Sequence, residues 1–481
     1  MEQGNNKTYP EKQHGPKTGS GWVQPEDRTV PITTTSRRYQ DRVSWWAVFY
    51  RSVPDGIGIG GMKYVFNPVE VTFRRLFWLL LILSGVGLLT YHITIRAQYL
   101  ATYPTSVTVI SNYEEVLAFP TVAICNYNTY RRSAVEGTEF ADFLNELFDN
   151  FFAVNTSSPH APYVDSVTMS ELFTQYGHRA EETIAFGTWR STGALSHANF
   201  TTKVTDWGLC FIFNDASNGN PPVTVTRSGK QHGLELLLNV QQYESFLEPN
   251  GRISTGFQVH IYDYGTEPRV VDHGFGIAPG THTHVAVEVT ETSNLEQPYG
   301  VCHDKPLKYF DKYGFPECFI ECQSDFFFNA CGCKFFATPM ASNEAECTVL
   351  GFYTCGNQYY GSFVQNHTCD CPVPCSIRSY RPTISTTAYP SAYWEQKVAA
   401  ENPISEDYLK ENFCMLSIYF KEMSIRQITQ KIDYTFFGFL CDVGGSLGLW
   451  LGGSILTFFE FFDLFGYSLF TYFKRIPNSR K

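Results

Sequence analysis

Glycines and carboxylates share the second of two long apolar stretches in this chain, and together they could handle cations. Segment 444–454 holds five glycines, and Glu460 and Asp463 follow within the same stretch. A glycine inside a helix costs roughly 1 kcal/mol relative to alanine, so clustered glycines indicate close backbone approach or carbonyls that face something other than lipid. Acids inside a membrane are rare and usually face a bundle interior or water. The stretch therefore predicts a path for cations rather than a lipid-facing helix.

A simpler interpretation stays open for the glycines alone. Three of them recur at the four-residue spacing of a helix-packing face: Gly444, Gly448 and Gly452. We favour the cation path because Ser454, Thr457 and Glu460 follow at three-residue steps. In a continuous helix, this spacing places two hydroxyls and a carboxylate on one side. Such a stripe would be wet and would attract cations.

Two membrane-spanning helices must position these residues. Segment 76–95 contains no Asp, Glu, Lys or Arg and has the roughly 20 residues that cross a bilayer. The polar start of the chain does not suit a cleavable signal peptide, and basic residues at 74–75 and 474–475 fit the positive-inside tendency, so we expect both termini in the cytosol. The expected division is a disordered cytosolic tail (1–40), a cytosolic pre-membrane segment (41–73), a first span (74–96), an exterior domain (97–433), a pore-lining second span (434–473) and a cytosolic tail (474–481).

The exterior segment mixes strand and helix patterns, which predicts an α+β domain. Alternating or β-branched runs favour strands at 107–110, 234–240, 257–262, 284–289 and 413–420. The last of these would lead the chain back to the membrane. Such a strand would transmit force from the exterior to the second span.

The clearest exterior helix covers 139–152. One face is apolar and includes Phe140 and Phe143, while a second stripe carries Asp142, Glu146 and Asp149. A core face beside a solvated face is the ordinary interpretation. The alternative is a surface that offers aromatic and anionic side chains together to a cationic, aromatic ligand.

Cysteine usage supports the exterior placement, because thirteen of the fourteen cysteines lie between residues 125 and 414. Ten of them crowd 302–375, and an even count in an oxidising compartment favours disulfides, although spacing alone cannot choose the pairs. Zinc is the alternative for the clusters at 331–333 and 369–375, but no suitably spaced histidine pair accompanies them. Glycosylation sequons lie in the same exterior segment at Asn155, Asn199 and Asn366.

The remaining exterior residues suggest neither catalysis nor a cofactor. His282 and His284 would share one face of a strand and could bind a metal, although solvent-exposed histidines are the more ordinary outcome. We find no convincing Ser-His-Asp arrangement or paired-acid site, so we expect no enzyme. The net charge of -11 argues against nucleic acid and for a cation-attracting exterior.

Three sequence motifs, in this order, resemble those of the degenerin/epithelial sodium channel family. They are FPTVAICN at 119–126, GLCFIFN at 208–214 and the strand motif that starts at Gly233, and the likeness covers about 55–463. The resemblance implies a trimeric membrane channel of α+β class. Each subunit would contribute two transmembrane helices and one large disulfide-rich extracellular α/β domain. Three copies of the second helix would line the pore, because the two helices of one subunit cannot enclose one.

The resemblance also implies roles for individual residues. Gly452, Gly453 and Ser454 match the family's selectivity filter. The pore and gate would further involve Cys441, Asp442, Gly444, Gly445, Gly448, Thr457, Glu460 and Asp463. The family's cytosolic gating motif is His-Gly, whereas this chain has Asp55-Gly56, which keeps the glycine and loses the imidazole.

The family's disulfide pattern, carried over, implies five pairs: Cys302 with Cys375, Cys318 with Cys371, Cys322 with Cys369, Cys331 with Cys355, and Cys333 with Cys347. Cys125, Cys210 and Cys414 remain as an odd set. We pair Cys125 with Cys210, which leaves Cys414 without a partner.

The residues of the second-helix motif look closest to those of the peptide-gated sodium channels of molluscs and annelids, which respond to FMRFamide-like neuropeptides. That likeness implies a homotrimeric, amiloride-sensitive sodium channel of the plasma membrane, opened by a short amidated neuropeptide. A cationic, aromatic peptide needs carboxylates and aromatic rings. The expected site is therefore Phe140, Asp142, Phe143, Glu146 and Asp149.

Two alternatives remain. One is a proton-gated or constitutively open sodium channel of the same family, with extracellular carboxylates or histidines as the proton sensor. The other, from a different class, is a membrane-anchored adhesion or receptor protein without conductance, in which the glycines only pack helices.

Overall fold

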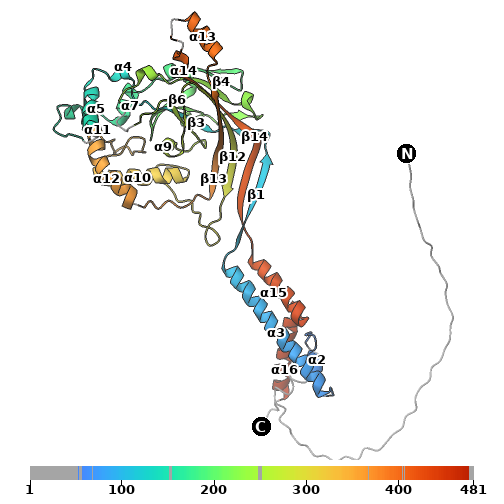
Figure 1. Ribbon diagram of the computed structural model, residues 1–481. Helices are drawn as coiled ribbons and strands as arrows, with labels where there is room; N and C mark the ends of the chain where they lie inside the picture. The colour runs from blue at the N-terminus through green and yellow to red at the C-terminus, as the bar shows by residue number, and fades with distance from the viewer. Residues whose placement is uncertain are drawn as a thin grey trace, which may run out of the picture. The chain divides into compact units, whose positions relative to one another are not determined.

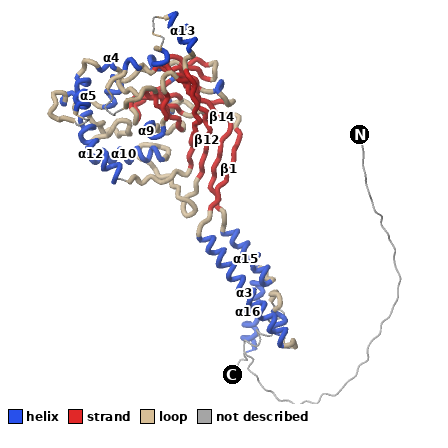
Figure 2. The backbone as a smooth tube through the Cα atoms, in the orientation of Figure 1, coloured by secondary structure: helices blue, strands red, loops and turns tan. Residues whose placement is uncertain are grey.

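The computed structural model describes residues 53, 57–67, 69–150, 154–247, 252–366, 368–402, 405 and 407–475 (Figures 1 and 2). The chain divides into two compact units. One comprises Met1–Leu88 and Leu447–Lys481, and the other comprises Leu89–Ser446.

The larger unit is built on a seven-stranded sheet around the long strand β14 (Phe413–Ile432). On one side, β14 pairs in parallel with β12 (Thr281–Ser293), which pairs antiparallel with β13 (Ser376–Ala388). On its other side, residues 413–418 pair with β9 (Leu234–Asn239), and residues 424–432 pair with β1 (Thr105–Tyr113). Strands β4 (Ile184–Trp189) and β5 (Gly193–Leu195) continue the sheet beyond β9. Figure 2 shows β1, β12 and β14 running side by side.

A second, five-stranded sheet is antiparallel throughout. Its order is β11 (Phe275–Ile277), β10 (Phe257–Tyr262), β3 (Thr121–Asn126), β7 (Gly208–Phe213) and β6 (Phe200–Thr205). A short ladder joins β2 (Leu117–Ala118) to β8 (Thr224–Val225). The strand expected at 257–262 has these bounds, and the strands expected at 107–110, 284–289 and 413–420 lie within longer ones.

The main hydrophobic core draws on both sheets. Ile124, Phe211 and Phe257 from the five-stranded sheet cluster with Leu236 and Ile418 from the seven-stranded sheet. The residues of β3 and β10 are buried along their whole length, which explains why their sequences read as continuous apolar runs rather than as alternation.

The larger unit also contains helices. They are α4 (Arg132–Val135), α5 (Glu139–Asp149), α6 (Ala161–Val164), α7 (Met169–Tyr176), α8 (Ala180–Thr183), α9 (Val270–His273), α10 (Phe315–Cys331), α11 (Val349–Gly351), a π-helical turn (Phe352–Gly356), α12 (Asn357–Asn366), α13 (Ala392–Glu401) and α14 (Tyr408–Asn412). Helix α5 begins where the Thr138 hydroxyl accepts a hydrogen bond from the Ala141 N–H. It ends at Asp149, three residues before the expected end, and 151–153 lie outside the described residues.

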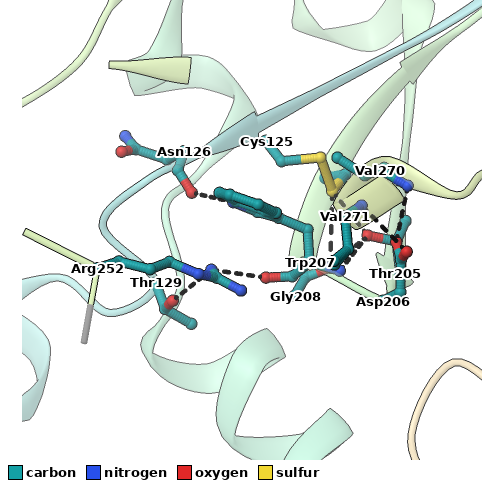
Figure 3. The surroundings of a disulfide bond; sticks show 11 residues. Cys125, Asn126, Thr129, Thr205, Asp206, Trp207, Gly208, Arg252, Val270 and Val271 are labelled. Atoms are coloured by element: carbon teal, nitrogen blue, oxygen red, sulfur yellow. Dashed lines mark hydrogen bonds between the residues drawn. A yellow bond between two sulfur atoms is a disulfide. The ribbon is translucent and has the colours of Figure 1, made fainter. Parts of the chain in front are cut away.

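Six disulfides brace the larger unit, and they are the pairs written above: Cys125–Cys210, Cys302–Cys375, Cys318–Cys371, Cys322–Cys369, Cys331–Cys355 and Cys333–Cys347. Cys125 and Cys210 face each other across β3 and β7 (Figure 3). The Cys414 thiol is buried and outside any disulfide, and its burial raises its pKa to about 12. Such a thiol is inert, because the thiolate is the reactive form.

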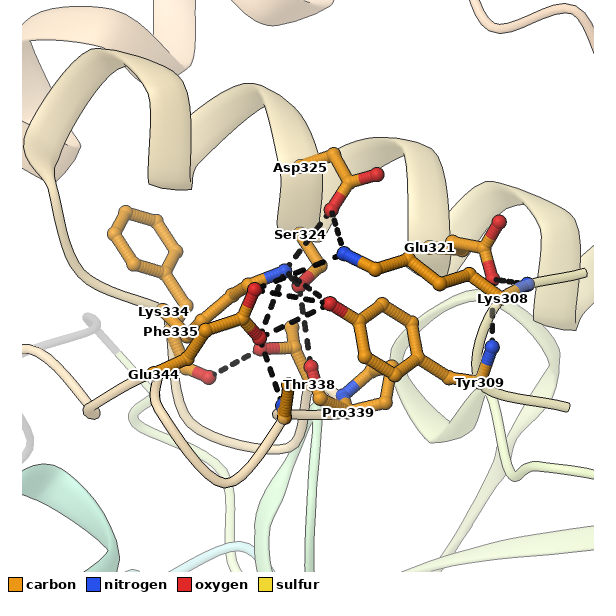
Figure 4. A network of polar contacts seen from close by, with 11 residues as sticks. Lys308, Tyr309, Glu321, Ser324, Asp325, Lys334, Phe335, Thr338, Pro339 and Glu344 are labelled. Atoms are coloured by element: carbon orange, nitrogen blue, oxygen red, sulfur yellow. Dashed lines mark hydrogen bonds and ion pairs between the residues drawn. The ribbon is translucent and has the colours of Figure 1, made fainter.

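A buried lysine completes the bracing beside α10. The Lys334 side chain is 0% exposed, and its ammonium donates to Ser324 Oγ at 2.7 Å and to Asp325 Oδ1 at 3.0 Å. The Glu344 carboxylate lies 3.7 Å away and accepts a hydrogen bond from Tyr309 (Figure 4). Because a buried charge is costly unless it is paired, this network fixes the loop that contains Cys333 and Cys347 against the helix.

Two candidate membrane spans remain. The first is α3 (Thr72–Ala101), which is longer than the expected 74–96, and the short α2 (Met62–Phe66) precedes it. The second is a pair of helices, α15 (Phe436–Leu451) and α16 (Ile455–Arg475), bent by 73° at a break. The second span expected at 434–473 is therefore two helices rather than one, and the break falls on Gly452, Gly453 and Ser454.

Candidate functional site

The break in the second span follows from the backbone conformation and the hydrogen bonds of the residues at 452–457. Gly452 has φ +63°, a left-handed conformation that glycine adopts without a steric penalty. The last N–H groups of the first segment still find acceptors, since Gly452 donates to Gly448 O at 3.0 Å. Beyond the break, Ser454 N–H donates to Thr457 Oγ1 at 3.0 Å, and Thr457 N–H donates to Ser454 O at 3.0 Å. Gly452 thus ends one helix, and Ser454 begins the next.

This geometry corrects the expected polar stripe. Ser454 lies before the helix, so only Thr457 and Glu460, three residues apart within α16, still share a side of a helix, and the Thr457 hydroxyl accepts a hydrogen bond from the Ser454 N–H. The Glu460 carboxylate accepts a hydrogen bond from the Gly58 N–H at 2.7 Å. Glu460 therefore holds the segment that precedes α2, a contact that its position in the sequence did not suggest.

The segment 57–61 makes two further close contacts within the same unit. Gly60 N–H donates to Leu451 O at 3.0 Å, immediately before the break. Gly61 has φ +86°, and a Cβ there would collide with the Trp78 indole of α3. A Cβ on Gly85 would lie 2.8 Å from Trp450 O, so glycine is required for α3 to pack against the end of α15. The Asp55-Gly56 motif lies outside the described residues.

The helix-packing interpretation of the glycines fits only some of them. A Cβ on Gly448 would lie 3.6 Å from Gly453 O, but Cβ atoms on Gly444 and Gly445 would meet nothing within 4 Å among the described residues. Within the described residues, these two glycines therefore do not serve helix packing.

At the other end of the spans, Asp442 is held from two sides. Arg96 Nε of α3 lies 3.3 Å from Asp442 Oδ2, and the Tyr434 hydroxyl donates to the same oxygen at 2.6 Å. Tyr99 packs on the Tyr434 ring at 5.3 Å. The neighbouring Cys441 is exposed and forms no disulfide in the described part of the chain.

The strands that adjoin the two spans are paired to each other. β1 follows α3 in the chain and β14 precedes α15, and the two strands pair antiparallel from Thr105 with Ile432 to Tyr113 with Ser424. Just before β1, Tyr103 has φ +49° and its ring meets the Tyr299 ring edge-on at 5.3 Å. A displacement of β14 would therefore be transmitted to the end of α3 and to the start of α15.

Two buried and two half-buried histidines do not suit a sensor of mild acid. Burial lowers the pKa of His260 and His282 to about 4, and it also lowers the pKa of His178 and His284. His282 and His284 share one strand face, with ring centroids 4.0 Å apart. Among the residues that the structure describes, no group of three His, Cys, Asp or Glu side chains could hold a metal, so this pair lacks a third ligand.

One buried and two half-buried carboxyls behave in the opposite way. Burial raises the pKa of Asp206, Glu317 and Glu346. Each accepts backbone N–H groups from a different element. Asp206 accepts from Val270 and Val271 of α9 at 3.0 and 3.1 Å (Figure 3). Glu317 accepts from the Glu267 N–H at 2.8 Å, and Glu346 accepts from the Ser170 N–H of α7 at 3.0 Å. Sequence reasoning missed all three, because no motif or spacing relates them.

The expected peptide site is wrong in its aromatic half. Phe140 is 1% exposed and stacks on Tyr176, while Phe143 is 3% exposed, because the apolar face of α5 packs into the unit's second core. The Glu146 carboxylate is engaged by the side chains of Asn155 and Ser158. Of the five residues of the expected site, only Asp142 and Asp149 are exposed.

The glycosylation sequons are partly accessible. Asn155 and Asn199 are exposed, and the side chain of Asn366 lies outside the described residues.

Comparison with known proteins places these features in a family. The sequence model of the family described as Amiloride-sensitive sodium channel matches residues 55–464. The chain is 29% identical to acid-sensing ion channel 1C of Danio rerio, over 84% of this chain and 80% of that protein. It is 28% identical to acid-sensing ion channel 2 of Homo sapiens (84% and 83% covered) and to acid-sensing ion channel 1 of Gallus gallus (84% and 81%). A cryo-EM structure of a proton-activated chloride channel matches with a TM-score of 0.32 at 8% identity, covering 82% of this chain and 93% of that one, a likeness too weak to inform function.

Proposed function

The chain belongs to the amiloride-sensitive sodium channel family, and from this premise we propose that it forms a sodium-selective channel that extracellular acid opens. The family is one of ion channels rather than enzymes, and it implies sodium ions as cargo and amiloride as a blocker. Two membrane spans flanking a disulfide-rich extracellular domain fit a channel of the plasma membrane.

We place the selectivity filter at Gly452, Gly453 and Ser454. The observation that supports this placement is the break in the second span, because there the backbone leaves the helical hydrogen-bonding ladder. Three subunits would bring three such breaks together, since two spans cannot surround a pore. Thr457 supports the break, Glu460 anchors the segment before α2, and Asp463 supplies negative charge beyond the filter.

The gate in this proposal is the outer part of α15, from Cys441 to Gly445, with Gly448 below it. Asp442 is bonded to Arg96 and Tyr434. On opening, these three residues must therefore either move together or exchange their bonds for others. Gly444 and Gly445 carry no side chain that could obstruct a neighbouring helix. The paired strands β1 and β14 provide the link from the extracellular domain to this region.

Acid is the stimulus that the relatives and the titratable groups favour. The relatives named above are acid-sensing channels, and the structure holds buried carboxyls whose pKa is raised and whose bonds cross between elements. By linkage, a conformation in which a carboxyl has the higher pKa is favoured as pH falls. Acid would therefore shift the channel towards conformations that bury Asp206 and Glu346, as here, and away from those in which water solvates them.

An amidated neuropeptide remains the competing stimulus, but Phe140 and Phe143 of its expected site are buried in the core and cannot contact a ligand.

Whole-cell recordings that apply a step to pH 5, then FMRFamide at pH 7.4, then amiloride during the evoked current would separate the possibilities. We expect an inward sodium current with acid alone that amiloride blocks. A current evoked only by the peptide would replace our proposal, and surface-expressed protein without any current would favour the non-conducting receptor.

A further inference from the structure

A cavity of about 480 Å³ lies in the larger unit, between the end of β10, the start of α10 and the first half of β13. It is distinct from the spans and from the acidic face of α5. We propose that this cavity binds a small organic cation, a primary amine or guanidinium attached to an aromatic body. The proposal concerns binding alone and does not depend on which stimulus opens the channel.

Two polar atoms in the cavity wall have no hydrogen-bond partner among the described residues. They are Glu317 Oε2 and His260 Nδ1, on side chains that are 4% and 7% exposed. The other carboxylate oxygen of Glu317 accepts the Glu267 N–H at 2.8 Å, so only Oε2 is uncommitted. An unpaired buried polar atom destabilises the fold, and more so when it is charged. A ligand that donates to Glu317 would remove this cost.

The other charges that line the cavity are already matched. Lys312 Nζ lies 3.1 Å from Asp263 Oδ2, and Arg378 Nε donates to Glu291 at 3.0 Å. Arg269 pairs with Asp272. Among the described residues that line the cavity, an anionic ligand would therefore find no unpaired Lys or Arg side chain, and it would meet the Glu317 carboxylate. A metal ion is disfavoured too, because no three potential ligands converge in the described part of the chain.

The walls suit an organic cation. Aromatic side chains contribute much of the lining: Tyr262, Phe275, Tyr313, Phe315 and Tyr380. Ring faces attract cations, and a volume of a few hundred Å³ is typical of small-molecule sites. His260 stacks on Tyr262 at 5.0 Å, and its lowered pKa, about 4, leaves the ring neutral at pH 7. Its Nδ1 can then exchange a hydrogen bond with the ligand without repelling it.

Occupation of the cavity would connect three elements. The first turn of α10, which carries Glu317, would be tied through the ligand to β10 and to β13. β13 pairs with β12, and β12 pairs with β14, the strand that precedes α15. A bound amine would thus stabilise one arrangement of α10 on the sheet that leads to the second span.

Binding of benzylamine to the full-length protein in lipid nanodiscs, measured at pH 7.4 by isothermal titration calorimetry, tests this site. Benzyl alcohol serves as the uncharged match. We expect saturable binding of benzylamine and at least about tenfold weaker binding of benzyl alcohol, because both can donate a hydrogen bond to Glu317 but only the ammonium also pairs its charge with the carboxylate. Glu317→Gln should weaken benzylamine by a similar factor.

Glu235→Gln is the matched control, since Glu235 lies on β9 outside the cavity and its loss removes the same charge from the same unit. His260→Phe is the second variant, which keeps a ring on Tyr262 but removes Nδ1, and it should weaken binding even if Glu317→Gln fails to fold. Equal affinity of wild type, Glu317→Gln and His260→Phe would overturn the proposal, as would the absence of saturable binding to the wild type.

Discussion

The contact between Glu460 and Gly58 makes the sharpest prediction about the spans. Glu460→Gln preserves the shape of the side chain but replaces a charged acceptor of the Gly58 N–H, 2.7 Å away, with a neutral one. A hydrogen bond to a charged group contributes about 1.5–3 kcal/mol, whereas a neutral one contributes about 0.5–1.5. The substitution should therefore weaken the anchoring of segment 57–61 by about 1–1.5 kcal/mol, which is about a tenfold change in the ratio of anchored to released channels.

Gly58→Ala attacks the same contact from the other side. An added Cβ would lie 3.1 Å from Glu460 Oε2 and 3.5 Å from Thr457 Oγ1, so the carboxylate must move. If both substitutions act on one bond, their effects should be strongly non-additive, and the double variant should be little worse than either single one.

The assay is the sodium-to-potassium permeability ratio, obtained from reversal potentials in excised patches. Because the Gly60 N–H of the same segment donates to Leu451 O next to the proposed filter, release of the segment should change this ratio. Asp463→Asn is the control, since it removes a carboxylate from the same helix without a bond to segment 57–61 in the described structure. Identical effects of Glu460→Gln and Asp463→Asn, or full additivity with Gly58→Ala, would refute the anchoring argument and leave only a ring of charge.

Four further predictions concern the rest of the molecule. Asp206→Asn should flatten the pH dependence of stability: wild type, whose Asp206 pKa is raised by burial, should gain stability relative to the variant as pH falls from 7.5 towards that pKa, as thermal melts would record. Phe140→Ala should lower the free energy of unfolding by about 3–5 kcal/mol, because it empties a buried site, and denaturant titration against Asp142→Asn, expected to be near neutral, would show it. Tyr103→Ala should remove about 0.5–1.5 kcal/mol of ring contact with Tyr299 and slow or reduce acid-evoked opening at unchanged surface expression. Gly85→Val should abolish current and surface delivery, since even a Cβ would lie 2.8 Å from Trp450 O, whereas Gly87→Ala, with nothing within 4 Å in the described residues, should be tolerated.

The amphipathic helix expected at 139–152 illustrates what can and what cannot be predicted from the sequence. Its periodicity predicted the helix, and α5 forms with a threonine cap and an apolar face. Periodicity cannot say whether an apolar face meets the core or a ligand, because both need the same residues. Only the packing of Phe140 and Phe143 against Tyr176 and Tyr353 decided that the face is core.

The sequence by itself determined the features that depend on local composition. Apolar segments long enough to cross a bilayer predicted two spans, and thirteen cysteines in one segment predicted a disulfide-rich domain. Three motifs in the right order predicted the family. These features can be recognised from the sequence because each depends on one segment alone. The length of an apolar segment decides whether it can span a bilayer, and the oxidising compartment decides whether its cysteines form disulfides.

Tertiary structure alone decided the contacts between distant residues. Glu460 and Gly58 meet although 402 positions separate them, and Glu317 and His260 become neighbours of one cavity only when α10 packs against β10 and β13. The raised pKa of Asp206 likewise arises from burial beside α9. Desolvation, hydrogen-bond pairing and glycine contact depend on what surrounds a residue in space, and no local pattern of residues records those surroundings.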